Sequence, residues 1–383
     1  MYYSIPYLIL IFILGFLSIL LYQKQDQQSV SYKKICFIGI AVFFLFFGFR
    51  GFIFTDWVSY YYEFERCSWS DLTYSQNSVI IREPGYLLLM NLCKTLYNNY
   101  HFFICVNTAI NTILLTIFFK KYTDNILFAF VIYLVFWGFV ISANLVRNAT
   151  AIFIFLNSIS YLHGRNLLRY IACCLLAMSF HFSAIIYLPI YFFFNKRMNK
   201  WVYLAIFISS NIIFLLHVPI ITKIISLLGF GGDFLQTKLE YYGESSQGRG
   251  IGIGFIERII TGGLIFCYYE KLCLKKINSI FINAITTYFV ITLTFNQLPE
   301  MGNRIGILFI FSYWVLWIEL RNCFAIRSNQ LLFLSFVTIY CILKTATTIN
   351  GPIYEYDNIL LGKIKSYQER KYIFDRTFEE AKY

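Results

Sequence analysis

Charged residues are scarce in this chain, and that scarcity excludes most soluble folds. Asp, Glu, Lys and Arg make up 14% of its 383 residues, whereas an average soluble domain carries roughly 25%. So few charges cannot cover the surface of a water-soluble protein of this length. Proline and glycine are also few, with 6 and 21 residues, which argues against a disordered or low-complexity chain.

Metal-binding and redox motifs are missing as well. The sequence contains no CxxC, no HExxH and no histidine cluster, so neither a protein-held metal nor another cofactor is indicated. Most of the ten cysteines lie inside apolar runs, where we expect them to pack as small hydrophobic residues. Cys67 and Cys93 fall in one long loop, where an oxidising compartment allows a disulfide, but the sequence leaves their pairing open.

What the chain has instead is long apolar runs. Runs such as 5–22 and 35–49 approach or reach the roughly 20 residues that an α-helix needs to cross a bilayer. No positive residue precedes the first run and no small-x-small cleavage site follows it, so we expect a retained helix. Period-two alternation is absent, which argues against an outer-membrane barrel. The runs predict an all-α, polytopic transmembrane helix bundle with about twelve spans, near 5–22, 35–54, 100–119, 126–143, 146–163, 167–180, 182–195, 201–217, 255–271, 278–296, 303–320 and 329–348.

The loops between these runs differ in charge, which predicts their orientation. Six short loops on one side hold fifteen Lys or Arg residues and only four Asp or Glu residues, whereas the opposite side up to Arg304 holds ten of each. Short basic loops face the cytoplasm, so the net charge of +12 is a topology signal and not a nucleic-acid footprint. We therefore expect one membrane domain over 1–360, with outer loops 55–99 and 218–254, and a short charged tail over 361–383.

Arginines and carboxylates gather on the predicted outer side. A charge at membrane depth usually faces a bundle interior or a wet cavity, although snorkelling of single side chains to the interface is an alternative. The planar guanidinium fork suits phosphate or carboxylate. Nearby aromatic residues suit sugar rings, or else form an interfacial belt. The pattern predicts an anionic, lipid-like ligand in one outward-opening cavity, bounded by Arg50, Asp56, Arg82, Glu83, Arg147 and Arg304.

Six segments carry a family resemblance: FRGFIFTDWVSYYYEFE (48–64), REPGYLLLM (82–90), NLVRNATAIFIF (144–155), HFSA (181–184), EMGNRIGILF (300–309) and PIYEYDNIL (352–360). In this order they resemble the EpsG family of bacterial polysaccharide-synthesis membrane proteins, which is related to the Wzy-type O-antigen and capsule polymerases. One position departs from the family pattern. Many relatives have G-x-D where this chain has Phe54-Thr55-Asp56, and phenylalanine lacks the backbone freedom of glycine.

The resemblance implies a function that composition does not. Wzy-type polymerases transfer a growing chain from undecaprenyl pyrophosphate onto a hydroxyl of the next lipid-linked oligosaccharide, at the outer face of the bacterial cytoplasmic membrane. The implied fold is that of a GT-C-like membrane glycosyltransferase. The implied partners are the lipid-linked donor and acceptor and membrane lipid, with a chain-length regulator and a flippase as further candidates. No nucleic acid is expected.

The resemblance also gives the charged residues candidate roles. For the departing pyrophosphate we expect contacts from Arg147 and Arg304, and next from Arg50 and Arg82. A base must take the acceptor proton, and its identity stays open among Asp56, Glu83, Glu300 and His181. We expect Tyr60 and Tyr61 to line the sugar path.

Two other classes of function remain open. A transporter or flippase of lipid-linked oligosaccharide would need an alternating cavity, often with inverted repeats, and no repeat is found. A non-catalytic membrane subunit of a synthesis complex would need no aligned set of arginines and carboxylates.

Overall fold

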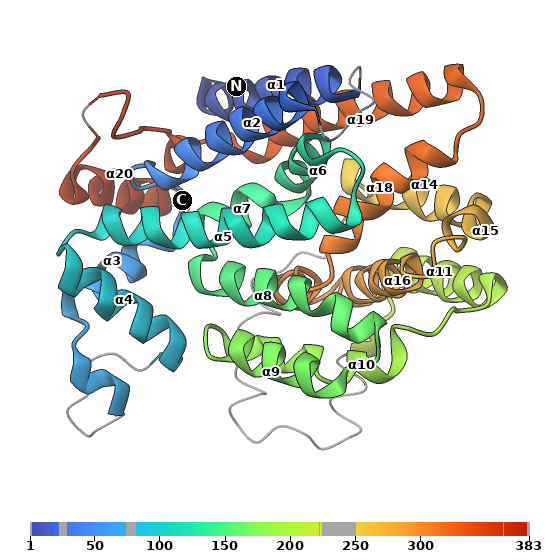
Figure 1. Ribbon diagram of the computed structural model, residues 1–383, viewed down its shortest axis with the longest axis horizontal. Helices are drawn as coiled ribbons and strands as arrows, with labels where there is room; N and C mark the ends of the chain where they lie inside the picture. Colours follow the sequence, from blue (N-terminus) through green and yellow to red (C-terminus); the bar gives the residue numbers. More distant parts are fainter. Residues whose placement is uncertain are drawn as a thin grey trace. The chain divides into compact units, whose positions relative to one another are not determined.

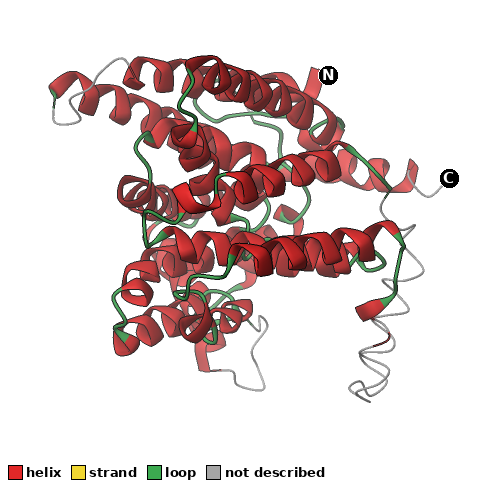
Figure 2. Cartoon of the chain, turned by 90° about the vertical axis from the view of Figure 1, so that its right-hand side faces the viewer, coloured by secondary structure: helices red, strands yellow, loops and turns green. Residues whose placement is uncertain are grey.

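The computed structural model describes residues 2–22, 29–73, 82–221, 223, 250–362 and 364–380, and these residues form helices and loops without strands (Figure 2). The prediction of an all-α protein is confirmed for this part of the chain. Most of the predicted outer loop 218–254 lies outside the described residues. The chain divides into two compact units, Met1–Tyr191 with Leu332–Tyr383, and Phe192–Leu331.

The first unit contains the longest apolar helices. Among the described residues, five segments are long and apolar enough to cross a membrane. They are α1 (Ile5–Tyr22) with the preceding turn η1 (Tyr2–Ser4), α2 (Val30–Gly48), α5 (Tyr100–Tyr122), the segment from α6 (Ile126–Tyr133) through the π-helical turn η3 (Leu134–Gly138) to α7 (Phe139–Ala143), and α19 (Arg327–Thr348).

Asparagine side chains start several of these helices. Asn99 accepts a hydrogen bond from the Phe102 N–H at the start of α5, and Asn125 does the same for Phe128 at the start of α6. Each cap satisfies one of the backbone N–H groups that a helix leaves open at its first turn. The sequence thus sets where α5 and α6 begin.

Shorter helices complete the first unit. They are α3 (Trp57–Arg66), η2 (Trp69–Thr73), α4 (Pro84–Leu96), α8 (Val146–His163), α9 (Leu167–Met178), η4 (Phe182–Tyr187), α10 (Ile190–Phe193), η5 (Pro352–Tyr354) and α20 (Tyr367–Glu380). Helix α5 packs against both α2 and α8 (Figure 1), and α8 packs against α9. Helices α3 and α4 enclose an aromatic core with the start of α5, in which Cys67 and Cys93 are buried as free thiols. The segment predicted as a charged tail contains α20, which packs against η5.

The second unit is organised around one buried helix. Helix α16 (Asn278–Thr294) packs against α11 (Lys200–Leu215), α17 (Pro299–Gly306) and α18 (Phe311–Cys323), while α14 (Ile253–Cys267) packs against α11 and α15 (Tyr269–Leu272). Helices α17 and α18 are jointly long and apolar enough to span a membrane but are bent by 67° at their junction.

The described residues therefore hold five candidate spans, or six if the bent pair counts as one. Helix occurs in every one of the twelve ranges predicted from sequence. In the other ranges the helices are shorter or more polar. Helix α9, for example, has 12 residues, a length of about 18 Å at 1.5 Å per residue, against a hydrocarbon core of roughly 30 Å.

Candidate functional site

The site begins where the chain leaves α2. The extended segment after this helix runs beside the late PIYEYDNIL segment: the Gly51 N–H donates to the Asp357 carbonyl (3.0 Å), and the Phe54 N–H donates to the Ile353 carbonyl (3.0 Å). The two segments are close, because a Cβ atom at 51 would lie 2.2 Å from Asp357 Oδ1 and would displace that carboxylate. Two segments some 300 residues apart in the sequence thus hold each other in place.

Phe54 takes the backbone conformation that glycine would favour. Its φ is +66°, in the left-handed region that costs an ordinary residue roughly 1–2 kcal/mol. The ring is buried and meets Tyr7 and Tyr354 edge-on, at centroid distances of 6.4 and 5.0 Å. Aromatic packing and the Ile353 hydrogen bond therefore hold this turn without a glycine.

Asn144 positions the aspartate that follows this turn. Its side-chain oxygen accepts hydrogen bonds from the backbone N–H groups of Thr55 (3.0 Å) and Asp56 (2.7 Å), and from the Thr55 hydroxyl (3.2 Å). The Thr55 hydroxyl also contacts Asp56 Oδ1 at 3.0 Å. The first asparagine of NLVRNATAIFIF thus places Asp56 at the start of α3.

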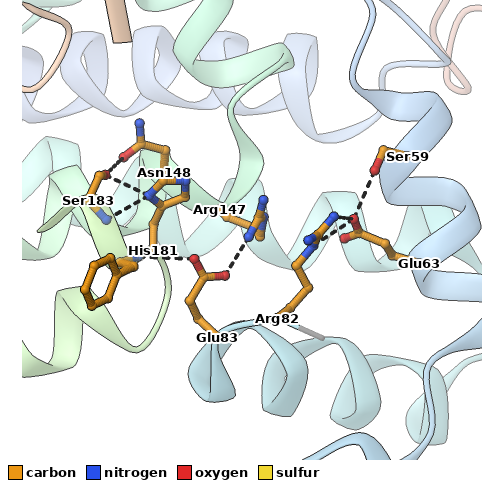
Figure 3. Close-up of polar contacts among 9 residues, drawn as sticks. Ser59, Glu63, Arg82, Glu83, Arg147, Asn148, His181 and Ser183 are labelled. Carbon is orange, nitrogen blue, oxygen red and sulfur yellow. Dashed lines mark hydrogen bonds and ion pairs between the residues drawn. The ribbon is translucent and has the colours of Figure 1, made fainter. Parts of the chain in front are cut away.

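Arg147 and Glu83 form the central ion pair of the site (Figure 3). Arg147 Nη1, on α8, donates to Glu83 Oε2 at 2.5 Å, and the two side chains are 17% and 18% exposed. The other oxygen, Glu83 Oε1, accepts from the Phe182 backbone N–H at 3.1 Å. Burial raises the pKa of Glu83, but the Arg147 guanidinium and the backbone N–H groups of Glu83 and Phe182 outweigh burial and leave this pKa lowered. Glu83 is therefore ionised at neutral pH.

A second ion pair lies beside the first. Arg82 donates to Glu63 Oε1 from Nε (2.9 Å) and Nη2 (2.5 Å), and the Ser59 hydroxyl donates to the same oxygen at 3.0 Å (Figure 3). Glu63 is buried on α3, whereas about a third of the Arg82 side chain is exposed. Arg82 thus connects to α3 through Glu63, and the adjacent Glu83 connects to α8 through Arg147.

The EPG turn docks onto the HFSA turn. The Gly85 N–H donates to the Ser179 carbonyl at 2.7 Å, and a Cβ atom at 85 would lie 2.4 Å from Ser179 Oγ. His181 Nδ1 contacts the Ser183 hydroxyl at 2.7 Å and caps η4 through the Ser183 N–H. Gly85 and His181 thus both shape the turn at Phe182, whose backbone N–H donates to Glu83.

Of the residues in these contacts, Arg147 and Ser59 line a cavity of about 520 Å³, within the roughly 300–1,000 Å³ of typical small-molecule sites. Arg82, Glu83 and His181 are not part of its lining. Arg147 and Asp56 both face it. Burial raises the pKa of the Tyr60 phenol in its wall, and the Arg147 guanidinium opposes that rise. The cavity thus combines a cation, a carboxylate and aromatic surface, and its lining consists of Thr55, Asp56, Val58, Ser59, Tyr60, Tyr62, Arg147, Tyr367 and Phe374.

Two further predicted site residues, Arg50 and Tyr61, are not in this lining. Arg50 is almost completely buried and donates to the carbonyls of Phe47 (2.6 Å) and Ala143 (3.3 Å). Tyr61 is not in the lining and stacks on Tyr367 at 4.4 Å. Glu300 and Arg304 belong to α17, in the second unit, and their membership of the cavity stays a prediction.

The residues of the site that were not predicted include Glu63, Asn144, Tyr367 and Phe374. A helical pattern indicates Glu63, since Asp56, Ser59, Tyr60 and Glu63 recur at i, i+3, i+4 and i+7 and so share one face of α3. The sequence carries no comparable signal for the other three. Among the described residues, no group of three His, Cys, Asp or Glu side chains is arranged to hold a metal ion.

The site lies in a chain whose apolar helices are those of a membrane protein. No curated protein and no solved structure matches it. The model of the EpsG family matches residues 33–359, a range that includes all six motif segments but for the final residue of the last one. The chain therefore belongs to the EpsG family, a family of polysaccharide polymerases.

Proposed function

We propose that this protein is a membrane glycosyltransferase that polymerises lipid-linked oligosaccharide repeat units for O-antigen, capsule or exopolysaccharide synthesis. Membership of the EpsG family supports the polymerase role. The observation that carries the proposal is the cavity in which Arg147, Asp56 and aromatic side chains meet. An arginine suits a pyrophosphate, a carboxylate suits an acceptor proton, and aromatic faces suit sugar rings.

The reaction needs no activating nucleotide, because the donor carries its own leaving group. The bond between the donor sugar carbon and the undecaprenyl pyrophosphate oxygen breaks, and that carbon forms a bond to a hydroxyl oxygen of the acceptor. The acceptor proton passes to a base and then to solvent, and undecaprenyl pyrophosphate leaves with the electron pair. Fixed positive charge near the departing oxygen lowers the barrier, and holding both substrates in one groove supplies orientation.

Arg147 is the best candidate for the pyrophosphate contact. It lines the cavity together with Asp56. Arg82 is the next candidate, since it is partly exposed. Arg304 keeps its proposed role on the strength of the family resemblance. We reassign Arg50 to a positioning role, because it donates to backbone carbonyls.

Asp56 is the best candidate for the base. It lines the cavity, and Asn144 fixes the backbone that presents it. Glu83 suits a supporting role better, because the ion pair to Arg147 and the hydrogen bond from Phe182 occupy both of its oxygens. His181 and Glu300 stay as alternatives.

The remaining parts of the proposal concern the membrane. We propose about twelve spans in the bacterial cytoplasmic membrane, a GT-C-like arrangement, and a cavity that opens to the outer face. The loop charge asymmetry supports this orientation. The lipid-linked donor and acceptor are the proposed partners, with a chain-length regulator and a flippase as further candidates.

One reconstitution tests the function against its rivals. Membranes of a deletion strain would supply lipid-linked single repeat units, and the purified protein would be added in detergent. A polymerase converts them into a ladder of longer products, and Asp56→Asn protein does not. A flippase or a non-catalytic subunit gives no ladder in detergent, and that result would overturn the proposal.

A further inference from the structure

Helix α20 supplies part of the cavity wall, although it begins beyond residue 359, where the family match ends. Tyr367 and Phe374 line the cavity together with Asp56 and Arg147. Residues seven apart lie two turns apart on one face of an α-helix, so both rings project from the same side of α20. This part of the cavity wall therefore lies outside the residues that the family model matches.

A buried arginine anchors the helix. Arg370 is 2% exposed and donates to Glu355 Oε2 at 3.2 Å and to the Pro352 carbonyl at 3.4 Å. Arg370 also donates to the Glu355 carbonyl, and Lys365 forms an ion pair with the Glu355 carboxylate. Glu355 lies in the PIYEYDNIL segment, which holds the turn before Asp56. The same segment therefore positions both the catalytic-base candidate and α20.

Other rings hold the two wall residues in fixed orientations. Tyr367 stacks on Tyr61 at 4.4 Å and meets Trp57 edge-on at 5.5 Å, and Phe374 meets Trp57 edge-on at 6.2 Å. A ring already fixed by its neighbours loses little conformational freedom when a ligand binds. The aromatic wall is thus preorganised before any substrate arrives.

We propose that this face of α20 is the sugar-recognition wall of the cavity, and that Tyr367 and Phe374 select the sugar nearest the pyrophosphate. The inference rests on the proposed function, because it takes Arg147 as the pyrophosphate end of the cavity. The ligand is a glycosyl residue whose apolar ring face lies on the aromatic side chains. The Asp56 carboxylate and the Ser59 hydroxyl, at the start of α3, also line the cavity and suit the hydroxyl groups of the sugar.

Kinetics of matched variants test this role. Tyr367→Leu and Phe374→Leu keep apolar volume but remove the ring face, and Tyr372→Leu is the control because Tyr372 on the same helix is 67% exposed and not in the lining. With lipid-linked repeat units as substrate, we expect KM to rise about tenfold in the two wall variants, with kcat within about twofold. The control variant keeps both constants. Wall variants that match the control at equal melting temperature would overturn the inference.

Photocrosslinking separates this inference from the proposed function. Benzoylphenylalanine would replace Tyr367, or Tyr372 as the control, in cells that make the lipid-linked unit, and mass spectrometry would identify the adduct. We expect an adduct carrying the oligosaccharide at 367 and none at 372. If that adduct forms while purified protein makes no polymer, the polymerase proposal fails and the binding wall stands. If polymer forms and position 367 gives no more adduct than 372, the wall is refuted and the polymerase proposal stands.

Discussion

The roles of Arg147 and Glu83 separate in a double-mutant cycle. Arg147 has two possible tasks, to bind the pyrophosphate or only to hold Glu83, whose other oxygen fixes the turn at Phe182. Arg147→Lys keeps the positive charge and loses the planar fork. Glu83→Gln removes the negative charge and still offers an oxygen to the Phe182 N–H. Each change therefore targets one feature of the pair.

The expected magnitudes differ between the two tasks. A charge-assisted contact is worth roughly 1.5–3 kcal/mol, so losing a pyrophosphate contact slows transfer roughly ten- to a hundredfold. If Arg147 binds the pyrophosphate, Arg147→Lys still slows transfer substantially in the Glu83→Gln background, and the coupling energy is smaller than the effect of Arg147→Lys alone. If Arg147 only holds Glu83, the double variant is no slower than either single one, and the coupling equals the whole single effect.

The assay is the rate of product-ladder formation by purified variants, with the melting temperature measured on the same samples. Because both side chains are mostly buried, breaking the pair also lowers stability, and rates are compared well below the lowest melting temperature. Because the two side chains are in direct contact, we expect some coupling, but a coupling energy well below the full effect of Arg147→Lys alone. A coupling as large as the single effect, or a wild-type rate for Arg147→Lys, would refute the pyrophosphate role.

Three further predictions concern the same unit. Asp56→Asn should lower the polymerisation rate at least about a hundredfold at an unchanged melting temperature, and a fully active variant would move the base to His181 or Glu300. Gly85→Ala should lower the melting temperature, because its Cβ would lie 2.9 Å from the Ser179 carbonyl oxygen, whereas Gly15→Ala meets nothing within 4 Å and should not; equal losses would contradict the close docking of the turns. Since the pKa of Glu83 is lowered in the folded protein, its ion pair stabilises the fold above the ordinary carboxyl pKa of about 4.3, and this stabilisation disappears as pH falls through the lowered value. The melting temperature should therefore fall less steeply with decreasing pH in Glu83→Gln than in the wild-type protein. Identical pH dependences would contradict the stabilising role of this ion pair.

Periodicity and composition predict most of the helices but not how polar segments meet. Apolar runs such as 5–22 and 100–119 coincide with α1 and α5. In lipid, the backbone N–H and C=O groups of such a run must form hydrogen bonds within the segment, and an α-helix provides them. The pairing of Gly51 with Asp357 depends on backbone hydrogen bonds, which any residue pair can form. No single-sequence pattern encodes such a partner, so this pairing was not predicted.

The candidate site was predicted where local chemistry is distinctive and missed where it is not. An arginine or a carboxylate in an apolar sequence is conspicuous, so Arg147, Glu83 and Asp56 were named in advance. Tyr367 and Phe374 were not, because aromatic residues make up 21% of the chain and two more carry no signal. The left-handed turn at Phe54 was not predicted either. The rings of Tyr7 and Tyr354 that pack against Phe54 come from distant parts of the sequence.

Each of the main residues of this site is positioned by another residue, and this affects how a loss of activity is interpreted. Asn144 positions Asp56, Glu83 positions the turn at Phe182, and Asp357 packs against the segment that leads to Asp56. Removing a supporting residue displaces the residue that it positions. The resulting loss of activity can be as large as the loss caused by removing a reacting group. Single substitutions therefore identify members of the network without ranking them. Substitutions that preserve the supporting contact, such as Glu83→Gln, and couplings between pairs are what distinguish a residue that touches the substrate from one that holds it in place.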